Sequence, residues 1–230
     1  MLFDVIFGSG DIAFFDIIAS IVSSLIVIFL TLPVHEYAHA LVATKLGDPT
    51  PKFSGRLTVN PFRHIDYIGA LCILFIGVGY ALPVPINPRN FKNPKAGMAL
   101  TALAGPISNI VLAFINLFVI YFIVWLYPAA LINTVMSFII TVLELIAYIN
   151  VSLAVFNLIP IPPLDGSRLL AVVLPDRIYY KLLQYEKYLY YIILAVILLS
   201  SVNNSNGGFL SIATAKIMNI LSYIPRNIFF

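Results

Sequence analysis

Three long apolar runs, residues 12–31, 97–126 and 131–156, constrain the fold of this chain more than any other feature. A helix needs about 20 predominantly apolar residues to cross the hydrocarbon core of a bilayer, and each run reaches that length. Soluble domains carry about a quarter charged residues, whereas this chain has 10% charged and 61% hydrophobic residues. We therefore predict an all-α polytopic membrane protein, embedded in the lipid bilayer as a single domain over residues 1–230.

Weaker segments raise the expected number of transmembrane helices to about five to six. Residues 67–84 are apolar but short and contain glycine, and a helix from Asp176 to about residue 201 follows later in the chain. The last segment, residues 209–224, either spans the bilayer or lies at its surface as an amphipathic helix. We expect the core over residues 12–175 and accessory helices over residues 176–230.

The Lys and Arg residues indicate the topology. They gather in three loops, within residues 45–63, 89–95 and 168–187, and are absent from the N-terminal tail and from the turns at residues 127–130 and 203–208. Cytoplasmic loops carry the excess of basic residues, so these three loops are expected in the cytoplasm. The first two flank the short apolar segment, which favours a re-entrant hairpin there over a crossing, with a true span as the alternative. The first loop also contains residues 56–60, Arg-Leu-Thr-Val-Asn, where we expect a short strand.

Charge and cysteine content exclude several classes of function. The net charge of +3 is small and scattered, so we expect no nucleic-acid partner. The single cysteine, Cys72, excludes an internal disulfide and a cluster of thiolate metal ligands. The first residues lack a basic region and a cleavage site, so we expect no removable signal peptide.

The first apolar run continues into Leu-Pro-Val-His-Glu-Tyr-Ala-His-Ala at residues 32–40. The spacing places His35 and His39 one turn apart on one face of a helix, where they can bind one zinc ion. Glu36 can then act as general base toward the water on the metal. A lone helical histidine is more often a hydrogen-bonded core residue. An unpaired Glu near the membrane costs on the order of 3 kcal/mol, however, and a metal supplies the reason to keep it.

A catalytic zinc site needs a third protein ligand. His64 and Asp66 are candidates, but Asp165 is the better one, because it follows a span expected to end on the side of the membrane where the first span places His35 and His39. The prolines before Asp165 disfavour a regular helix and allow the chain to bend into a cavity. The alternative is that Asp165 is a turn or helix N-cap residue, as in many Asp-Gly pairs.

Three motifs in this order, His-Glu-Tyr-Ala-His, Ala-Gly-Pro-Ile-Ser-Asn and Asn-Leu-Ile-Pro-Ile-Pro-Pro-Leu-Asp-Gly, resemble the site-2 protease family of intramembrane zinc metallopeptidases. The segment at residues 81–94 is similar to that of the compact prokaryotic branch, and the length leaves no room for a PDZ or nucleotide-sensing domain. The resemblance implies one Zn²⁺ per chain, and its matched residues are the ligands His35, His39 and Asp165 and the catalytic base Glu36.

The same resemblance implies roles for two asparagines. Asn157 matches an asparagine that steadies the oxyanion or the substrate backbone, with a plain helix C-terminal residue as the alternative. Asn109 is expected to contact substrate or to pack between helices. The implied partners are transmembrane protein substrates, cleaved by a multi-pass protein of a prokaryotic cell membrane whose active site faces the cytoplasm.

Two other classes of function compete with the protease. A zinc transporter would need polar groups along a full path and often shows paired half-repeats, whereas the chain has one His and Glu cluster and no repeat. A non-catalytic scaffold would be expected to lose Glu36 or a ligand. A protease substrate must be unwound locally, and an extended substrate could pair with residues 56–60 or with the re-entrant segment.

Overall fold

The computed structural model describes residues 14–76, 79–189, 191–192, 195–196 and 209–230. Its elements are α2 (Phe14–Ile26), η1 (Val27–Thr31), α3 (Leu32–Lys45), α4 (Thr50–Phe53), η2 (Pro61–Arg63), α5 (Tyr67–Ile76), η3 (Pro88–Asn90), α6 (Pro94–Leu126), η4 (Pro128–Leu131), α7 (Thr134–Asn157), α8 (Gly166–Val173), α9 (Asp176–Gln184) and α11 (Phe209–Phe229). The described residues form no strand, which confirms an all-helical fold.

Three helical stretches are long and apolar enough to cross a membrane: Phe14–Lys45, Pro94–Leu126 and Thr134–Asn157. They match the three apolar runs, whereas the larger number of spans is not found among the described residues. The helix expected from Asp176 begins as α9, which ends at Gln184, and after a turn at Tyr185 residues 186–189, 191–192 and 195–196 are helical again. Residues 197–201 lie outside the described residues. The turn at residues 203–208 and the N-terminal tail also lie outside them.

The first stretch continues through Pro33 without a break. Proline has no N–H and crowds the preceding turn, so a helix must adjust around it. Here the adjustment is one π-helical turn, η1, in which the Leu32 N–H bonds to the Val27 carbonyl. The stretch therefore carries His35 and His39 onward in α3, as an extension of the same helical run.

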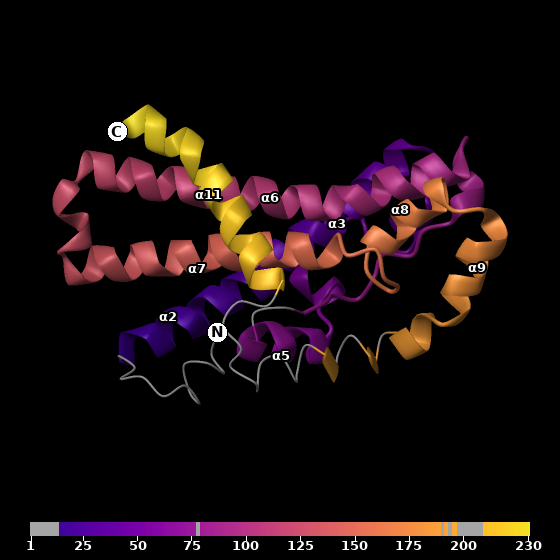
Figure 1. The fold of residues 1–230 in the computed structure, drawn as a ribbon, viewed down its shortest axis with the longest axis horizontal. Helices are drawn as coiled ribbons and strands as arrows, with labels where there is room; N and C mark the ends of the chain where they lie inside the picture. The colour runs from indigo at the N-terminus through magenta and orange to yellow at the C-terminus, as the bar shows by residue number, and fades with distance from the viewer. Residues whose placement is uncertain (1–13, 77–78, 190, 193–194, 197–208) are drawn as a thin grey trace.

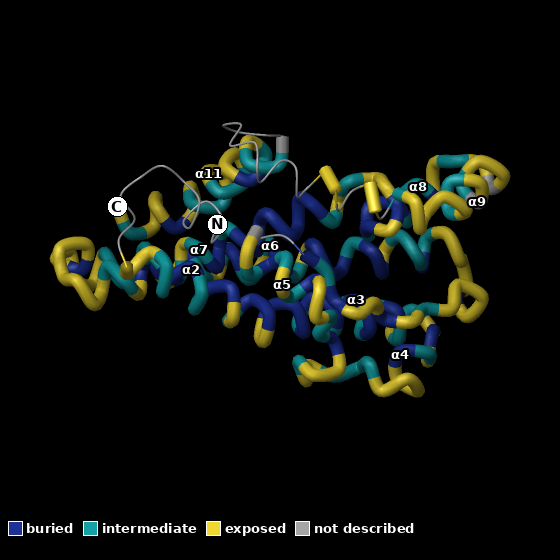
Figure 2. The backbone as a smooth tube through the Cα atoms, turned by 90° about the horizontal axis from the view of Figure 1, so that it is seen from below, coloured by how far each residue is buried: buried dark blue, intermediate teal, exposed yellow. Residues whose placement is uncertain are grey.

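The helices pack as a bundle with the core along its centre. α6 and α7 run side by side, joined by η4 at one end, and α2 and α3 pack against them (Figure 1). α11 crosses both α6 and α7, and its Leu210, Ile217 and Leu221 pack on their buried side chains. Figure 2 shows the buried residues along the middle of the bundle and the exposed residues at its ends.

The chain reverses direction around α5. The Leu82 N–H donates to the His64 carbonyl at 2.8 Å, so the two ends of the intervening segment meet. A Cβ atom on Gly69 would overlap the Tyr80 carbonyl, which shows how closely the returning backbone passes α5. This reversal is the shape expected of a hairpin, and its insertion into a bilayer stays a prediction.

The strand expected at residues 56–60 is wrong, because these residues form turns and irregular backbone. Hydrogen bonds from side chains hold this loop, in place of the backbone hydrogen bonds that a partner strand would form. His64 Nε2 donates to the Thr58 carbonyl at 2.8 Å, and the Arg56 guanidinium donates to the Arg63 and Leu82 carbonyls. The β-branched residues that suggested a strand lie in a loop held by these bonds.

Asp48 joins the loop after α3 to the loop before α6. Its side chain is fully buried and accepts hydrogen bonds from the Thr50 N–H and hydroxyl, from the Asn87 N–H at 2.7 Å and from Asn90 Nδ2 at 2.6 Å. Burial would raise the pKa of Asp48, but the hydrogen bonds from Thr50, Asn90 and Asn87 bring it below the ordinary 3.8.

We predict that Asp48→Ala lowers the free energy of unfolding by about 3 kcal/mol, because hydrogen bonds to a charged group each contribute about 1.5–3 kcal/mol. The pKa of Asp48 is lowered on folding, so its contribution is fully present above pH 3.8 and is lost as the pH falls through the folded pKa. Denaturation in detergent, followed by circular dichroism at several pH values, measures both effects. Asp16→Asn, at an exposed carboxylate, is the control and should change little. An equally small effect of Asp48→Ala would contradict the prediction.

Candidate metal centre

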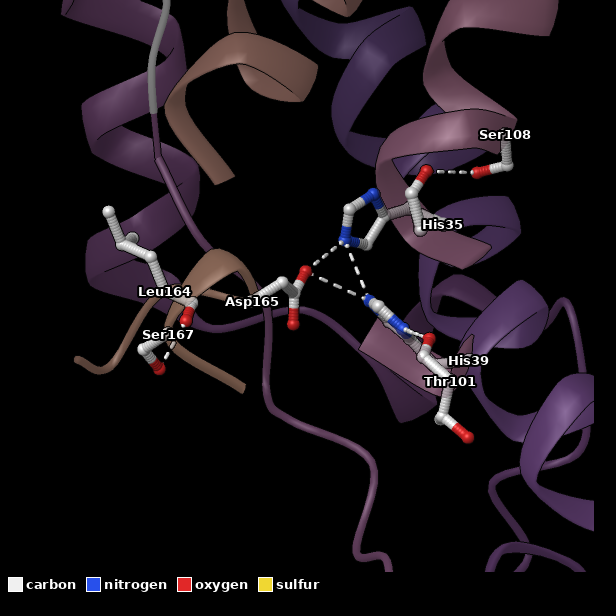
Figure 3. Close-up of polar contacts among 8 residues, drawn as sticks. His35, His39, Thr101, Ser108, Leu164, Asp165 and Ser167 are labelled. Atoms are coloured by element: carbon white, nitrogen blue, oxygen red, sulfur yellow. Dashed lines mark hydrogen bonds and ion pairs between the residues drawn. The ribbon is translucent and has the colours of Figure 1, made fainter. Parts of the chain in front are cut away.

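Three side chains from distant parts of the chain converge on one point. His35 Nε2 lies 3.1 Å from His39 Nε2, and the Asp165 Oδ2 atom lies 3.4 Å from the first nitrogen and 3.1 Å from the second. Figure 3 shows the three side chains pointing toward one another from α3 and from the segment before α8. Both imidazoles are buried, and the Asp165 side chain is 14% exposed.

The orientation of His39 is fixed from α6. Its Nδ1 lies 2.7 Å from the Thr101 carbonyl, which can only accept a hydrogen bond. His39 therefore carries a proton on Nδ1, which leaves Nε2, the atom that faces the other two side chains, as the nitrogen that can bind a metal. Such a carbonyl partner is the usual device that sets the tautomer and ring orientation of a metal-binding histidine.

Gly105 of α6 lies directly against the two imidazoles. A Cβ atom at this position would overlap His39 Nε2 and the Cε1 and Nε2 atoms of His35. Any larger residue would displace the two nitrogens from their present positions. Gly105 therefore allows α6 to pack against the polar face of α3.

Asp165 reaches the histidines because the chain bends sharply after α7. Gly166 begins α8 so close to the end of α7 that a Cβ atom on it would overlap the Leu158 carbonyl. Burial would raise the pKa of Asp165, but His39 and the hydrogen bonds from both imidazoles hold that pKa well below its usual range. Asp165 is thus an ionised carboxylate facing two imidazole nitrogens.

These three atoms fit a divalent metal of the zinc type. Zinc bonds of about 2.0–2.2 Å at tetrahedral angles place ligand atoms about 3.3–3.5 Å apart, close to the distances here. Two Nε2 atoms at 3.1 Å also need a shared proton or a cation between them, since their lone pairs repel. Among the described residues, His35, His39 and Asp165 are the group whose ligand atoms lie close enough to hold one metal ion.

A cavity of about 450 Å³ opens beside this group. Its lining includes two polar residues besides the metal group, Glu36, which is buried, and Asn157, at the end of α7. Its wall opposite is largely apolar and comes from α5 and from residues 79–86. The metal group therefore lies at the edge of a space large enough to take a segment of peptide.

The structure places the other sequence candidates elsewhere. His64 is fully buried and holds the loop at Thr58, and Asp66 lines the cavity but accepts hydrogen bonds from the N–H groups that begin α5. Neither belongs to the metal group. Asn109 is fully buried in α6 and is not among the residues that line the cavity.

Three residues near the site were missed from sequence. Thr101 and Gly105 act through the packing of α6 on α3, and Arg168 lines the cavity three residues after Asp165. The Ala-Gly-Pro-Ile-Ser-Asn motif signalled close helix packing at Gly105, but not which helix it faces. Thr101 acts through its backbone carbonyl, which every residue type has, so the sequence gives no sign of this contact.

A comparison with known families decides what this site belongs to. The model of peptidase family M50 matches residues 23–200, a range that holds every member of the metal group. The chain belongs to peptidase family M50. This confirms the site-2 protease family predicted from the three sequence motifs, and it makes the convergence of His35, His39 and Asp165 a candidate metallopeptidase centre.

Curated relatives carry names of the same kind. A Bacillus subtilis protein named "Putative zinc metalloprotease YwhC" is 39% identical over 163 residues, which cover 71% of this chain and 74% of the relative. A Mycobacterium tuberculosis protein named "Putative zinc metalloprotease Rip2" is 29% identical over 141 residues, or 60% of this chain and 51% of that relative. The M50 chain thus spans about half the length of Rip2. No solved structure matches.

We predict that Gly105→Ala abolishes or severely weakens metal binding while leaving the helices folded. Alanine favours helix more than glycine does, so the helix itself should not suffer. The added methyl group must instead displace His35 or His39. Bound zinc per purified chain, with circular dichroism for helix content, measures the effect. Ile107→Ala, on the exposed side of the same helix, should keep its metal, and full metal content in Gly105→Ala would contradict the geometry.

Proposed function

We propose that this M50 chain is an intramembrane zinc metalloendopeptidase that hydrolyses peptide bonds of membrane-spanning proteins near the cytoplasmic side. The observation that carries the proposal is the convergence of two histidines and a carboxylate at the edge of a cavity that Glu36 also lines. The family and the three membrane-length helices support a protease in a bilayer. The basic loops support the cytoplasmic side.

His35, His39 and Asp165 would hold the zinc ion. When bound there, zinc would polarise the scissile carbonyl and make a water molecule acidic enough to act near neutral pH. Glu36 is the general base, which takes the proton from the attacking water and passes it to the leaving amine nitrogen. Its position supports this role, because Glu36 directly follows the candidate ligand His35 in α3 and lines the same cavity.

Asn157 stabilises the negative charge that develops on the carbonyl oxygen. Its amide can donate hydrogen bonds, and it lines the cavity at the end of α7, eight residues before Asp165. A donor already in place beside the reacting carbonyl acts without reorganisation, which is why such groups lower reaction barriers strongly.

The substrate enters as an extended segment along residues 79–86. These residues have no regular secondary structure and most of them line the cavity, whereas residues 56–60 do not line it. A helical substrate hides its carbonyls in internal hydrogen bonds, so local unwinding must precede cleavage. Main-chain pairing with an extended segment would stabilise the unwound form.

We predict that Glu36→Gln keeps about one zinc ion per chain and lowers cleavage by about 10²–10⁴-fold, the usual contribution of a general base. Asp165→Ala should lose zinc and cleavage together. The measurement is bound zinc in purified protein and cleavage of single-span substrates reconstituted with it. Glu186→Gln makes the same change at an exposed position and should retain both properties.

Two outcomes would overturn the protease. If wild type binds zinc, cleaves none of the substrates and carries zinc across liposome membranes, the chain is a transporter. If Glu36→Gln cleaves as fast as wild type, the general base is another group and the mechanism above is wrong.

A further inference from the structure

Two buried side chains on facing helices have hydrogen-bonding atoms without partners in the described part of the chain. Asn109 of α6 is fully buried, and both its Oδ1 and its Nδ2 lack a partner. His35 of α3 is 3% exposed, and its Nδ1 also lacks one. Buried polar atoms are nearly always hydrogen-bonded, so each of these needs an explanation.

The packing of α3 on α6 places the two side chains on neighbouring turns of facing helices. His39 contacts the Thr101 carbonyl, and His35, one turn earlier in α3, contacts Gly105, one turn later in α6. The two helices are therefore antiparallel, and the next step along α6 is Asn109. A helical side chain leans toward the N-terminus of its helix, so Asn109 leans over Gly105, where the absence of a Cβ leaves His35 exposed to it.

The chemistry of the two groups is complementary. Asp165 and His39 face His35 Nε2, so a His35 that ligates a metal through Nε2 carries its proton on Nδ1. His39 has the Thr101 carbonyl as acceptor for its own Nδ1 proton, and the described residues offer His35 no such backbone partner. The Asn109 amide oxygen is an acceptor without a donor.

The Nδ2 group of Asn109 also has a complementary neighbour. By the same antiparallel register Asn109 faces Thr31, one turn before His35, and Asn150 Nδ2 of α7 lies 3.5 Å from the Thr31 hydroxyl. The Oδ1 atom of Asn150 has no partner. The structure has no direct hydrogen bond from Asn109 Nδ2 to this atom, so a buried water between the two amides would be the link from α7 to the side chain of His35.

We propose that Asn109 is a positioning residue for His35, whose Nδ1–H is joined to the Asn109 amide oxygen through a buried water. The inference rests on the proposed function, because it takes His35 as a metal ligand. We give Asn109 this role in place of the substrate contact expected from the sequence, since Asn109 does not line the cavity. Asn109 thus does for the first histidine what the Thr101 carbonyl does for the second.

The test compares zinc affinity with stability. Asn109→Leu removes the acceptor at similar size, Asn109→Asp keeps an oxygen at the same place, and Asn116→Leu is the matched control, because Asn116 lies on the same helix and donates to its own Leu112 carbonyl. The apparent Kd for Zn²⁺ is measured by competition with a chelator in detergent, and the melting temperature is measured on metal-free protein.

Loss of a group that orients a metal ligand typically weakens binding by about 10–100-fold, so we expect that loss in Asn109→Leu. Asn109→Asp should remain within a few-fold of wild type, and Asn116→Leu should match it. If Asn109→Leu does not yield folded protein, Asn109→Ala takes its place, since alanine has no side-chain acceptor and suits a helix.

Three results would overturn the proposal. The first is an unchanged zinc Kd in Asn109→Leu or Asn109→Ala with only a lower melting temperature, which would make Asn109 a packing residue. The second is an equal loss in Asn109→Asp. The third is a wild type that binds no zinc, and this result alone would also overturn the proposed function.

Discussion

The close contact between α3 and α6 at Gly105 is the interaction on which the rest of the site depends. It brings the carbonyl of Thr101 to His39, and it places the imidazole of His35 directly against Gly105 of α6. In a bilayer there is no bulk water to satisfy polar groups, so two imidazoles can lie inside a helix bundle only where a neighbouring helix supplies partners. A glycine at the contact permits that approach.

The site needs a third element because two residues on one helix cannot surround a metal. Asp165 comes from a segment that is neither α6 nor α7 but the sharp bend between α7 and α8, and Gly166 allows that bend. The helices fix the histidines, and the bend delivers the carboxylate with one side exposed to the cavity. Because all three side chains lie at the edge of the cavity, the space beside them is left open for a substrate.

Much of this arrangement could be predicted from sequence, and the failures have physical reasons. Apolar length located the three long helices, and the spacing of His35 and His39 determined their shared face. The larger number of spans stays a prediction, because three membrane-length helices are found among the described residues and part of the segment after α9 lies outside them. The strand at residues 56–60 was wrong because the Thr58 carbonyl accepts from the His64 side chain and the Asn60 N–H donates to the Thr58 hydroxyl, contacts that propensity does not register. Contacts through backbone, as at Thr101, carry no residue signature.

The polar atoms buried near the centre follow from the same constraint. A bundle that holds charged and imidazole groups at membrane depth needs a graded transition from those groups to the apolar core. Thr31, Asn109 and Asn150 provide it from three different helices, one turn inward from His35. Replacing such a layer with apolar residues would strengthen packing, but it would leave the outer nitrogen of His35 facing hydrocarbon. If His35 ligates a metal as we propose, this layer supplies the polar surroundings that its outer nitrogen needs.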